Sequence, residues 1–161
     1  MSATWTFPAF VDLLKTQLEA LPAILAFDPV PAVRLFQPAL GESLSDMIGL
    51  GGEVADDEKI QTALGSHSHD EEVRVSCIAE SVRYGSGDVE AVTARNVVNA
   101  YLDIIDEHIR TTDFVIGAAT LRAPRVEERH YTSYGTTVGE NQPARYARIL
   151  FDITYKARTT P

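Results

Sequence analysis

The chain has 161 residues, of which 45% are hydrophobic and 23% are charged, and a formal net charge of −9. These values are typical of an ordinary globular protein, and a single domain over residues 1–161 is expected. The acidic balance argues against binding to a nucleic-acid backbone, and no apolar run approaches the 18 residues of a membrane span. No signal-peptide pattern is present. One cysteine, Cys77, excludes an intrachain disulfide.

The first predicted element is a helix over residues 6–21. Thr6 is a suitable cap, Pro8 fits the first turn, and Pro22 marks the end. Apolar residues at three- and four-residue steps form one face that another element must cover; these are Phe7, Phe10, Val11, Leu14, Leu18 and Leu21. In the proline-rich connector that follows, residues 32–37 are predicted as a short strand. Residues 46–53 are a second strand candidate, weakened by three glycines.

A polar, irregular stretch follows at residues 54–70. It is predicted to be a long hairpin loop with a turn of helix near residues 58–64. Loops of this length in compact domains often serve as contact surfaces.

The strand and helix between residues 72 and 110 organise the rest of the chain. Val73, Val75, Cys77 and Ala79 alternate with polar residues, which predicts a half-buried strand. Cys77 is therefore expected to be a core residue and not a nucleophile. A Gly-Ser-Gly turn follows, and Asp88 is expected to cap a long amphipathic helix. Its apolar stripe contains Ala91, Ala94, Val98, Leu102, Ile105 and Ile109.

The C-terminal third predicts two more strands. Residues 111–117 form a turn and residues 118–126 a strand, in which Pro124 indicates an edge or a bulge. Residues 127–143 are predicted to be a second hairpin loop. Strict alternation over residues 146–158 predicts a central antiparallel strand. The expected fold class is α+β, an antiparallel or mixed sheet with the N-terminal helix and the long central helix packed on it, and with long hairpin loops.

Few residues suggest chemistry. His67 and His69 precede three carboxylates and form the most metal-like cluster, but they lie in a predicted loop and no second ligand pair has suitable spacing. Asp103, Asp106 and Glu107 form an acidic group on the long helix. A general acid/base pair would need a cleft around them, so a solvated helix face, with Arg110 four residues after Asp106, is the favoured explanation. Neither a serine elbow nor a phosphate-binding loop is present. No enzyme activity and no cofactor are expected.

The element order and sequence texture resemble the tail terminator proteins of long-tailed bacteriophages, particularly those of phages that infect actinobacteria. The resemblance covers residues 7–158 and includes the stretches DMIGLGG, HDEEVRVSC, DVEAVTARNVVNAYLDIIDEHIR and ARILFDITYKART. It implies an α+β fold that assembles into hexameric rings. Such rings cap the tail tube, stop its polymerisation, and present a surface to the head-completion protein. No catalytic residue comes with the resemblance.

The resemblance also implies where contacts are expected. Ring contacts of the family lie on sheet edges and extended loops, which by position here are residues 54–70 and 127–143. The candidate interface residues are Asp57, Lys59, His67, His69, Arg129, Tyr131 and Tyr134. An acidic channel wall formed by Asp103, Asp106 and Glu107 would let DNA pass without sticking. The expected location is the head–tail junction of a virion, after synthesis in the host cytoplasm.

Two alternatives remain open. The first is a neighbouring virion part, either a head-completion (neck) protein or the tail tube protein. The second belongs to a different class: a small α+β protein that binds a metal or another ligand through the His67/His69 loop.

Overall fold

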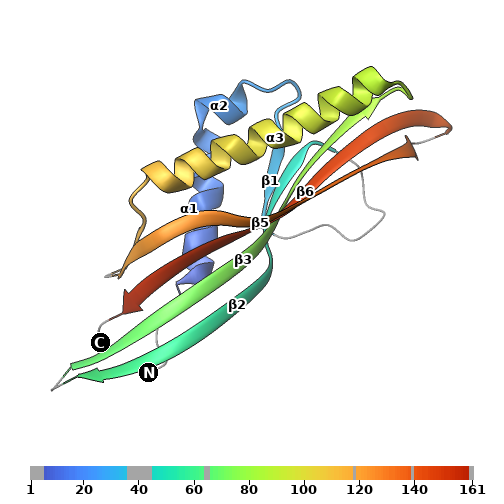
Figure 1. Cartoon of the computed structure of the whole chain (residues 1–161). Coiled ribbons are helices and arrows are strands. Elements are labelled where there is room, and N and C mark those ends of the chain that lie inside the picture. Colours follow the sequence, from blue (N-terminus) through green and yellow to red (C-terminus); the bar gives the residue numbers. More distant parts are fainter. Residues whose placement is uncertain (1–5, 36–44, 64–65, 118, 139, 160–161) are drawn as a thin grey trace.

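A computed structural model describes residues 6–35, 45–63, 66–117, 119–138 and 140–159 of the chain, and the side chains of residues 53–70 lie outside the described part. Helices and strands follow one another in a mixed order typical of an α+β domain (Figure 1). In chain order they are α1 (Phe7–Ala20), α2 (Pro22–Leu25), β1 (Ala32–Arg34), β2 (Met47–Ala63), β3 (Ser66–Tyr84), α3 (Asp88–Thr111), β4 (Val115–Ile116), β5 (Ala119–Val138) and β6 (Gln142–Thr159).

A six-stranded mixed sheet, in the order β1-β2-β3-β6-β5-β4, forms the framework of the molecule. All neighbouring strands are antiparallel except β1 and β2, which are parallel. β6 lies between β3 and β5, and its alternating residues Ile149, Phe151 and Ile153 are buried. The predicted α+β class with a mixed sheet is confirmed, and the strand predicted over residues 146–158 is the inner part of β6.

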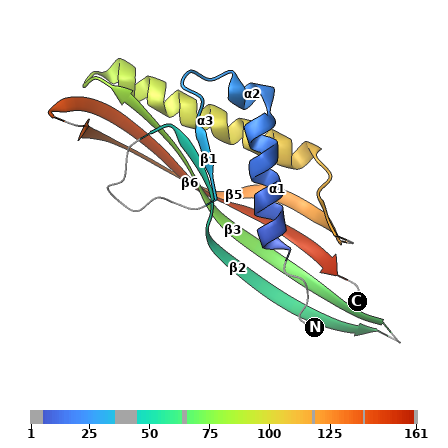
Figure 2. The same ribbon diagram turned by 180° about the vertical axis from the view of Figure 1, so that it is seen from behind.

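Both long helices pack on one face of the sheet (Figures 1 and 2). α3 contacts β3, β5 and β6, and α1 contacts β1 and β2. Phe10 of α1 joins the two regions, since its ring lies 4.7 Å from that of Tyr155 and 5.2 Å from that of Phe114. The inward residues of β3, including Cys77, belong to the same continuous core. The apolar stripes of the sequence are therefore the core faces of their elements.

The starts of the two long helices differ in detail from the expectation. Thr6 is the N-cap residue of α1, but its hydroxyl donates to the buried carboxylate of Glu71 at 2.8 Å instead of capping the helix. Asp88 does not cap α3: Gly87 is the N-cap residue, and no side chain bonds to the free amides there. Glu90 folds back over the turn, so that a Cβ atom on Gly85 would lie 2.6 Å from its carboxylate. The glycine turn thus makes room for Glu90.

Both predicted hairpin loops are wrong, because nearly all of their described residues lie in strands. β2 continues to Ala63 and pairs with β3 in an unbroken ladder from Glu53↔Ser76 to Ala63↔Ser66. The helical turn predicted near residues 58–64 is therefore wrong over residues 58–63, and its last residue lies outside the described part. Likewise β5 continues to Val138 and pairs with β6 down to Val138↔Gln142. These segments lack apolar alternation, and pairing with a neighbouring strand holds them extended. Figure 1 shows the two hairpins reaching opposite ends of the molecule.

Bulges bend the two long hairpins. The β2–β3 register shifts between Leu50 and Glu53, where Gly51 adopts a φ of 76°. The β5–β6 register shifts between Arg122 and Arg125, around the Pro124 that predicted an edge or a bulge, and again between Glu127 and His130. Bulges of this kind bend a strand and increase its twist.

Candidate assembly surfaces

The β2 strand leaves most of its outer edge open. β1 pairs with Met47, Ile48 and Gly49 only. From Leu50 to Ala63, no strand within the described ranges pairs with the side of β2 that faces away from β3. An edge of this length presents a row of backbone N–H and C=O groups that can accept another strand.

The β5 strand forms a second open edge on the other side of the sheet. β4 pairs only with Ala119 and Thr120. The Leu121 N–H still donates to the Phe114 carbonyl at 2.9 Å, but among the residues that the structure describes, none pairs with β5 from Arg122 to Val138 on the side away from β6. The sheet therefore ends in two long open edges, which belong to different strands.

The hairpins that carry these edges have opposite formal charge. The sequence of β2 contains four carboxylates and one lysine, and that of β3 contains four carboxylates and two arginines, so the β2–β3 hairpin has a net charge of −5. β5 contains three arginines and two glutamates, and β6 contains four basic residues and one aspartate, so these two strands have a net charge of +4. The net charge of −9 for the whole chain does not reveal that the two hairpins have opposite charge.

The acidic group on α3 is partly neutralised within the chain. Asp106 lies 3.3 Å from Arg110 and 3.6 Å from Arg129 of β5. Asp103 and Glu107 are exposed. The structure thus brings together Asp106 and Arg129, which the sequence had assigned to a channel wall and to a contact loop. At least one role of Arg129 is to join β5 to α3.

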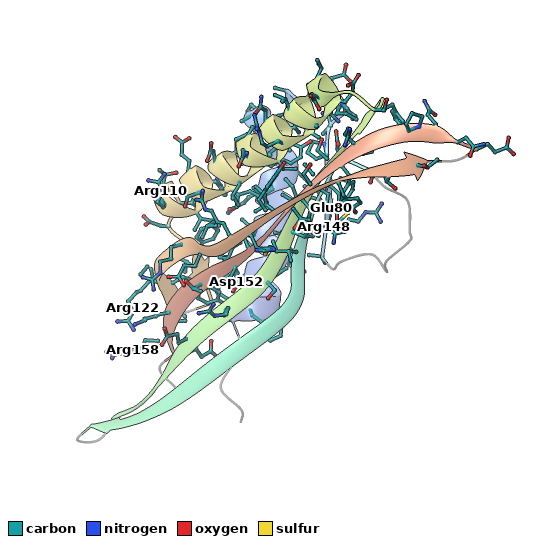
Figure 3. The ribbon with its side chains drawn as sticks, turned by 45° about the vertical axis from the view of Figure 1, so that its right-hand side comes forward. Glu80, Arg110, Arg122, Arg148, Asp152 and Arg158 are labelled. Atoms are coloured by element: carbon teal, nitrogen blue, oxygen red, sulfur yellow. The ribbon has the colours of Figure 1, made fainter. Side chains whose placement is uncertain are left out.

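The face of the sheet opposite the helices carries ion pairs that the sequence pattern did not indicate. Arg148 donates to Glu80 at 3.0 Å, and its guanidinium carbon lies 5.4 Å from the centre of the Tyr146 ring. Arg74 pairs with Asp152 at 3.0 Å across the same two strands. Figure 3 labels Glu80 and Arg148 next to each other and Asp152 farther along the sheet. Glu80 and Arg148 are ladder partners, so their opposite charges become a signal only when the register is known.

Tyr134, the ladder partner of Tyr146, lies on this face near the β5 edge, whereas Tyr131 pairs with the core residue Ile149 and lies on the helix-covered face. The Tyr134 ring lies 4.7 Å from the buried Tyr146 ring, and Tyr134 itself is 37% exposed. Tyr131 is 42% exposed. Both tyrosines proposed as contact residues are therefore accessible along the open edge of β5, on strand backbone instead of a loop.

The metal hypothesis gains no support from the part of the structure that has described side chains. There, no three His, Cys, Asp or Glu residues are grouped as metal ligands. His67 and His69 lie in β3, where their ladder partners on β2 are Thr62 and Ile60, neither of which is a metal ligand. Their side chains, like those of Asp57 and Lys59, lie outside the described part.

Buried titratable groups serve the fold. Burial raises the pKa of Cys77 to about 12, which keeps the thiol protonated and unreactive. Asp46 lines a pocket of about 330 Å³, but its carboxylate is 2.7 Å from Arg83 and also accepts the backbone N–H of Val82. Its oxygens are thus engaged by the protein itself. His108 bonds to Gln17 at 2.7 Å and ties α3 to α1. None of the described helices is long and apolar enough to cross a membrane.

Comparison with known proteins shows a similarity in fold to a solved structure. No known protein family and no curated protein matches the chain. Among solved structures, the chain is similar to one from the "Virion of native gene transfer agent (GTA) particle", with 14% sequence identity and a TM-score of 0.54. The alignment covers 99% of this chain and 100% of that chain. The two chains share a fold over their whole length.

Proposed function

We propose that the chain is a structural protein of a phage-like virion that forms a closed ring at the end of the tail tube. The ring would end tail polymerisation and offer the surface to which the head is joined. The observation that carries the proposal is the fold likeness to a chain of a virion particle, which leaves almost no residue of either chain unaligned. The order of elements that resembles tail terminators points the same way.

The open edges of β2 and β5 support self-assembly. Proteins that remain monomeric blunt their edge strands or cover them. Bulges interrupt both edges of this chain, but the regular stretches from Glu53 to Ala63 of β2 and from His130 to Val138 of β5 stay uncovered by the described residues, since β1 and β4 pair with only a few residues each. Rings close through contacts between two different surfaces of the same chain, and the two edges provide such a pair.

The exposed carboxylates of α3 are proposed to line the channel. Asp103 and Glu107 are exposed and, within the described residues, neither is in an ion pair, whereas Asp106 is shared between two arginines. Acidic groups in a lumen would repel the phosphates of passing DNA. Cysteine labelling of Asp103→Cys and Glu107→Cys in assembled rings tests this, with a reagent too large to enter the channel. Full labelling by the large reagent would place these residues outside the ring.

The ring itself is tested by mass and by tube capping. Six copies of the 17.6 kDa chain would give about 106 kDa. We expect light scattering to show this mass rising with concentration, and electron microscopy to show the protein at one end of purified tail tubes, which then stop elongating. A chain that neither associates nor binds tube ends would overturn the proposal. Incorporation along the whole tube would identify a tube protein instead, and binding only to head portals would identify a neck protein.

A further inference from the structure

We propose that copies of this chain join head to tail, with the open edge of β2 in one copy paired to the open edge of β5 in the next. The partner is therefore a second copy of this chain, and the contact involves two different strands. The inference deepens the ring proposed above and rests on it only for the closed number of copies. It is carried by strand direction, by the position of the covered stretches, and by charge.

Strand direction favours this pair of edges. β2 is antiparallel to β3, β3 to β6, and β6 to β5, so β5 runs antiparallel to β2 across the sheet. When two copies stand side by side in the same orientation, β5 of one meets β2 of the next in opposite directions. This is an antiparallel ladder, the more stable of the two pairing modes.

The covered stretches offset the two copies along the strands. β1 covers β2 at Met47, which lies in the ladder row of Glu80 near one end of β3. β4 covers β5 at Thr120. The next residue, Leu121, pairs with Ala157 of β6, which in turn pairs with Glu71 near the opposite end of β3. The open stretches therefore lie toward opposite ends of the sheet. Pairing them displaces each copy along the strand direction, and such a stagger accompanies sheets that close on themselves.

Charge separates this pairing from the alternatives. A two-fold contact between two β2 edges would bring together two strands that each carry four carboxylates and one lysine. A two-fold contact between two β5 edges would bring together two strands with three arginines and two glutamates each, each within a hairpin whose strands sum to +4. Like charges across a ladder are destabilising, whereas β2 against β5 sets an acidic hairpin against a basic one.

Two charge-reversal variants test the inference. Asp56→Lys/Asp57→Lys makes the β2 edge basic, and Arg122→Glu/Arg125→Glu makes the β5 edge acidic. Each variant alone should weaken self-association about tenfold or more, because its two edges then have the same sign. An equimolar mixture should restore association, since each edge of one variant matches the opposite edge of the other. Analytical ultracentrifugation measures all three, and circular dichroism verifies folding.

Matched controls change the net charge equally at positions away from the edges. Asp88→Lys/Asp113→Lys and Arg95→Glu/Arg110→Glu alter exposed residues of α3 and the segment after it, and both should associate like the wild type. If the β2 variant changes association in either direction while the β5 variant associates like the wild type, the contact does not involve β5 and the inference fails. It also fails if the mixture is not rescued, or if the controls are weakened as much as the edge variants.

Tube capping by the wild-type protein separates this inference from the proposed function. Wild-type rings that cap tubes, together with edge variants that assemble normally, would refute the edge pairing and leave the function standing. Rescue in the mixture, together with a wild type that forms open filaments and caps no tubes, would uphold the edge pairing and refute the ring.

Discussion

The buried ion pair between Asp46 and Arg83 gives the sharpest stability prediction. The side chain of Asp46, just before β2, is 1% exposed, whereas that of Arg83, near the end of β3, is 20% exposed. The Asp46 carboxylate accepts the backbone N–H of Val82 at 2.9 Å and the Arg83 guanidinium at 2.7 Å. In Asp46→Ala, the N–H of Val82 loses this acceptor, which costs about 1–3 kcal/mol. Removal of one partner of a fully buried pair costs about 3–5 kcal/mol.

The second cost must be discounted, because Arg83 reaches solvent and keeps its bond to the Val82 carbonyl. We therefore expect Asp46→Ala to lower the free energy of unfolding by about 2–4 kcal/mol in total. Urea unfolding followed by far-UV circular dichroism measures the loss, at one fixed protein concentration because self-association adds stability. Asp46→Asn keeps an oxygen acceptor and should lose less.

Asp28→Ala is the matched control, since Asp28 lines the same pocket but is exposed. It should change the free energy of unfolding by no more than about 0.5 kcal/mol. If Asp28→Ala and Asp46→Ala unfold at the same urea concentration, the ion pair and the Val82 bond do not stabilise the fold as argued.

Three other features of the core give shorter predictions. Cys77, whose pKa burial raises to about 12, should resist a disulfide reagent in the native protein and react after unfolding; fast native labelling would contradict this. Burial lowers the pKa of His108 from 6.5, so the unfolded chain binds the proton more tightly, and stability that is complete above pH 6.5 falls as the pH drops below it. His108→Gln should flatten this part of the stability curve in urea titrations, and an unchanged slope would refute the assignment. Gly51→Ala should cost about 1–3 kcal/mol, because φ is 76° and the new Cβ would lie 3.4 Å from the Leu35 carbonyl oxygen. Gly117→Ala, with a φ of 60° and no atom within 4 Å, should cost less in the same assay. Equal losses would show that the contact with the Leu35 carbonyl oxygen does not contribute to the cost at Gly51.

The helices and the inner strands could be predicted because burial of one face makes apolar residues recur along the sequence with the period of the helix or strand. α1 ends within one residue of the predicted bounds, since Phe10, Leu14 and Leu18 repeat at helical spacing against the sheet. β6 alternates because one of its faces is covered by helices, which bury Phe151 and Ile153. Where a single face meets the core, apolar residues must recur with the repeat of the element.

The outer halves of the hairpins could not be predicted in this way. The stretch EVADDEKIQTA of β2 has no apolar alternation, and only the ladder with β3 shows that it is extended. In β5, the stretch HYTSYGTTV contains threonines and tyrosines with high strand propensity. That composition is the one indication of a strand in this stretch, but Gly135 and the polar neighbouring residues indicate a loop more strongly. Strand propensity depends on how well a residue packs against a neighbouring strand, and the sequence of one segment does not say which strand that is.

The same limit applied to the candidate site. Arg129 was assigned to a loop, yet a bulge on either side of Glu127 places it 3.6 Å from Asp106 of α3. The pairing of Glu80 with Arg148 depends on a register between strands that are 68 residues apart. Charges identify partners only after the topology has brought their elements together.

The lack of apolar alternation in β2 also bears on how the assembly would be stabilised. A two-stranded ribbon without a covered apolar face is marginally stable in water, and additional strands are needed to hold it. Beyond Gly49, β2 has β3 as its one ladder partner in the described ranges, whereas β3 is held on its other side by β6 as far as His69↔Thr159. Pairing with β5 of a neighbouring copy would give β2 its second ladder. The ring contact would then stabilise the acidic hairpin as well as join two subunits, so charge reversal on β5 should increase amide exchange in the unchanged β2 of the same variant. Unchanged exchange there, under conditions where association is lost, would show that β2 needs no second strand.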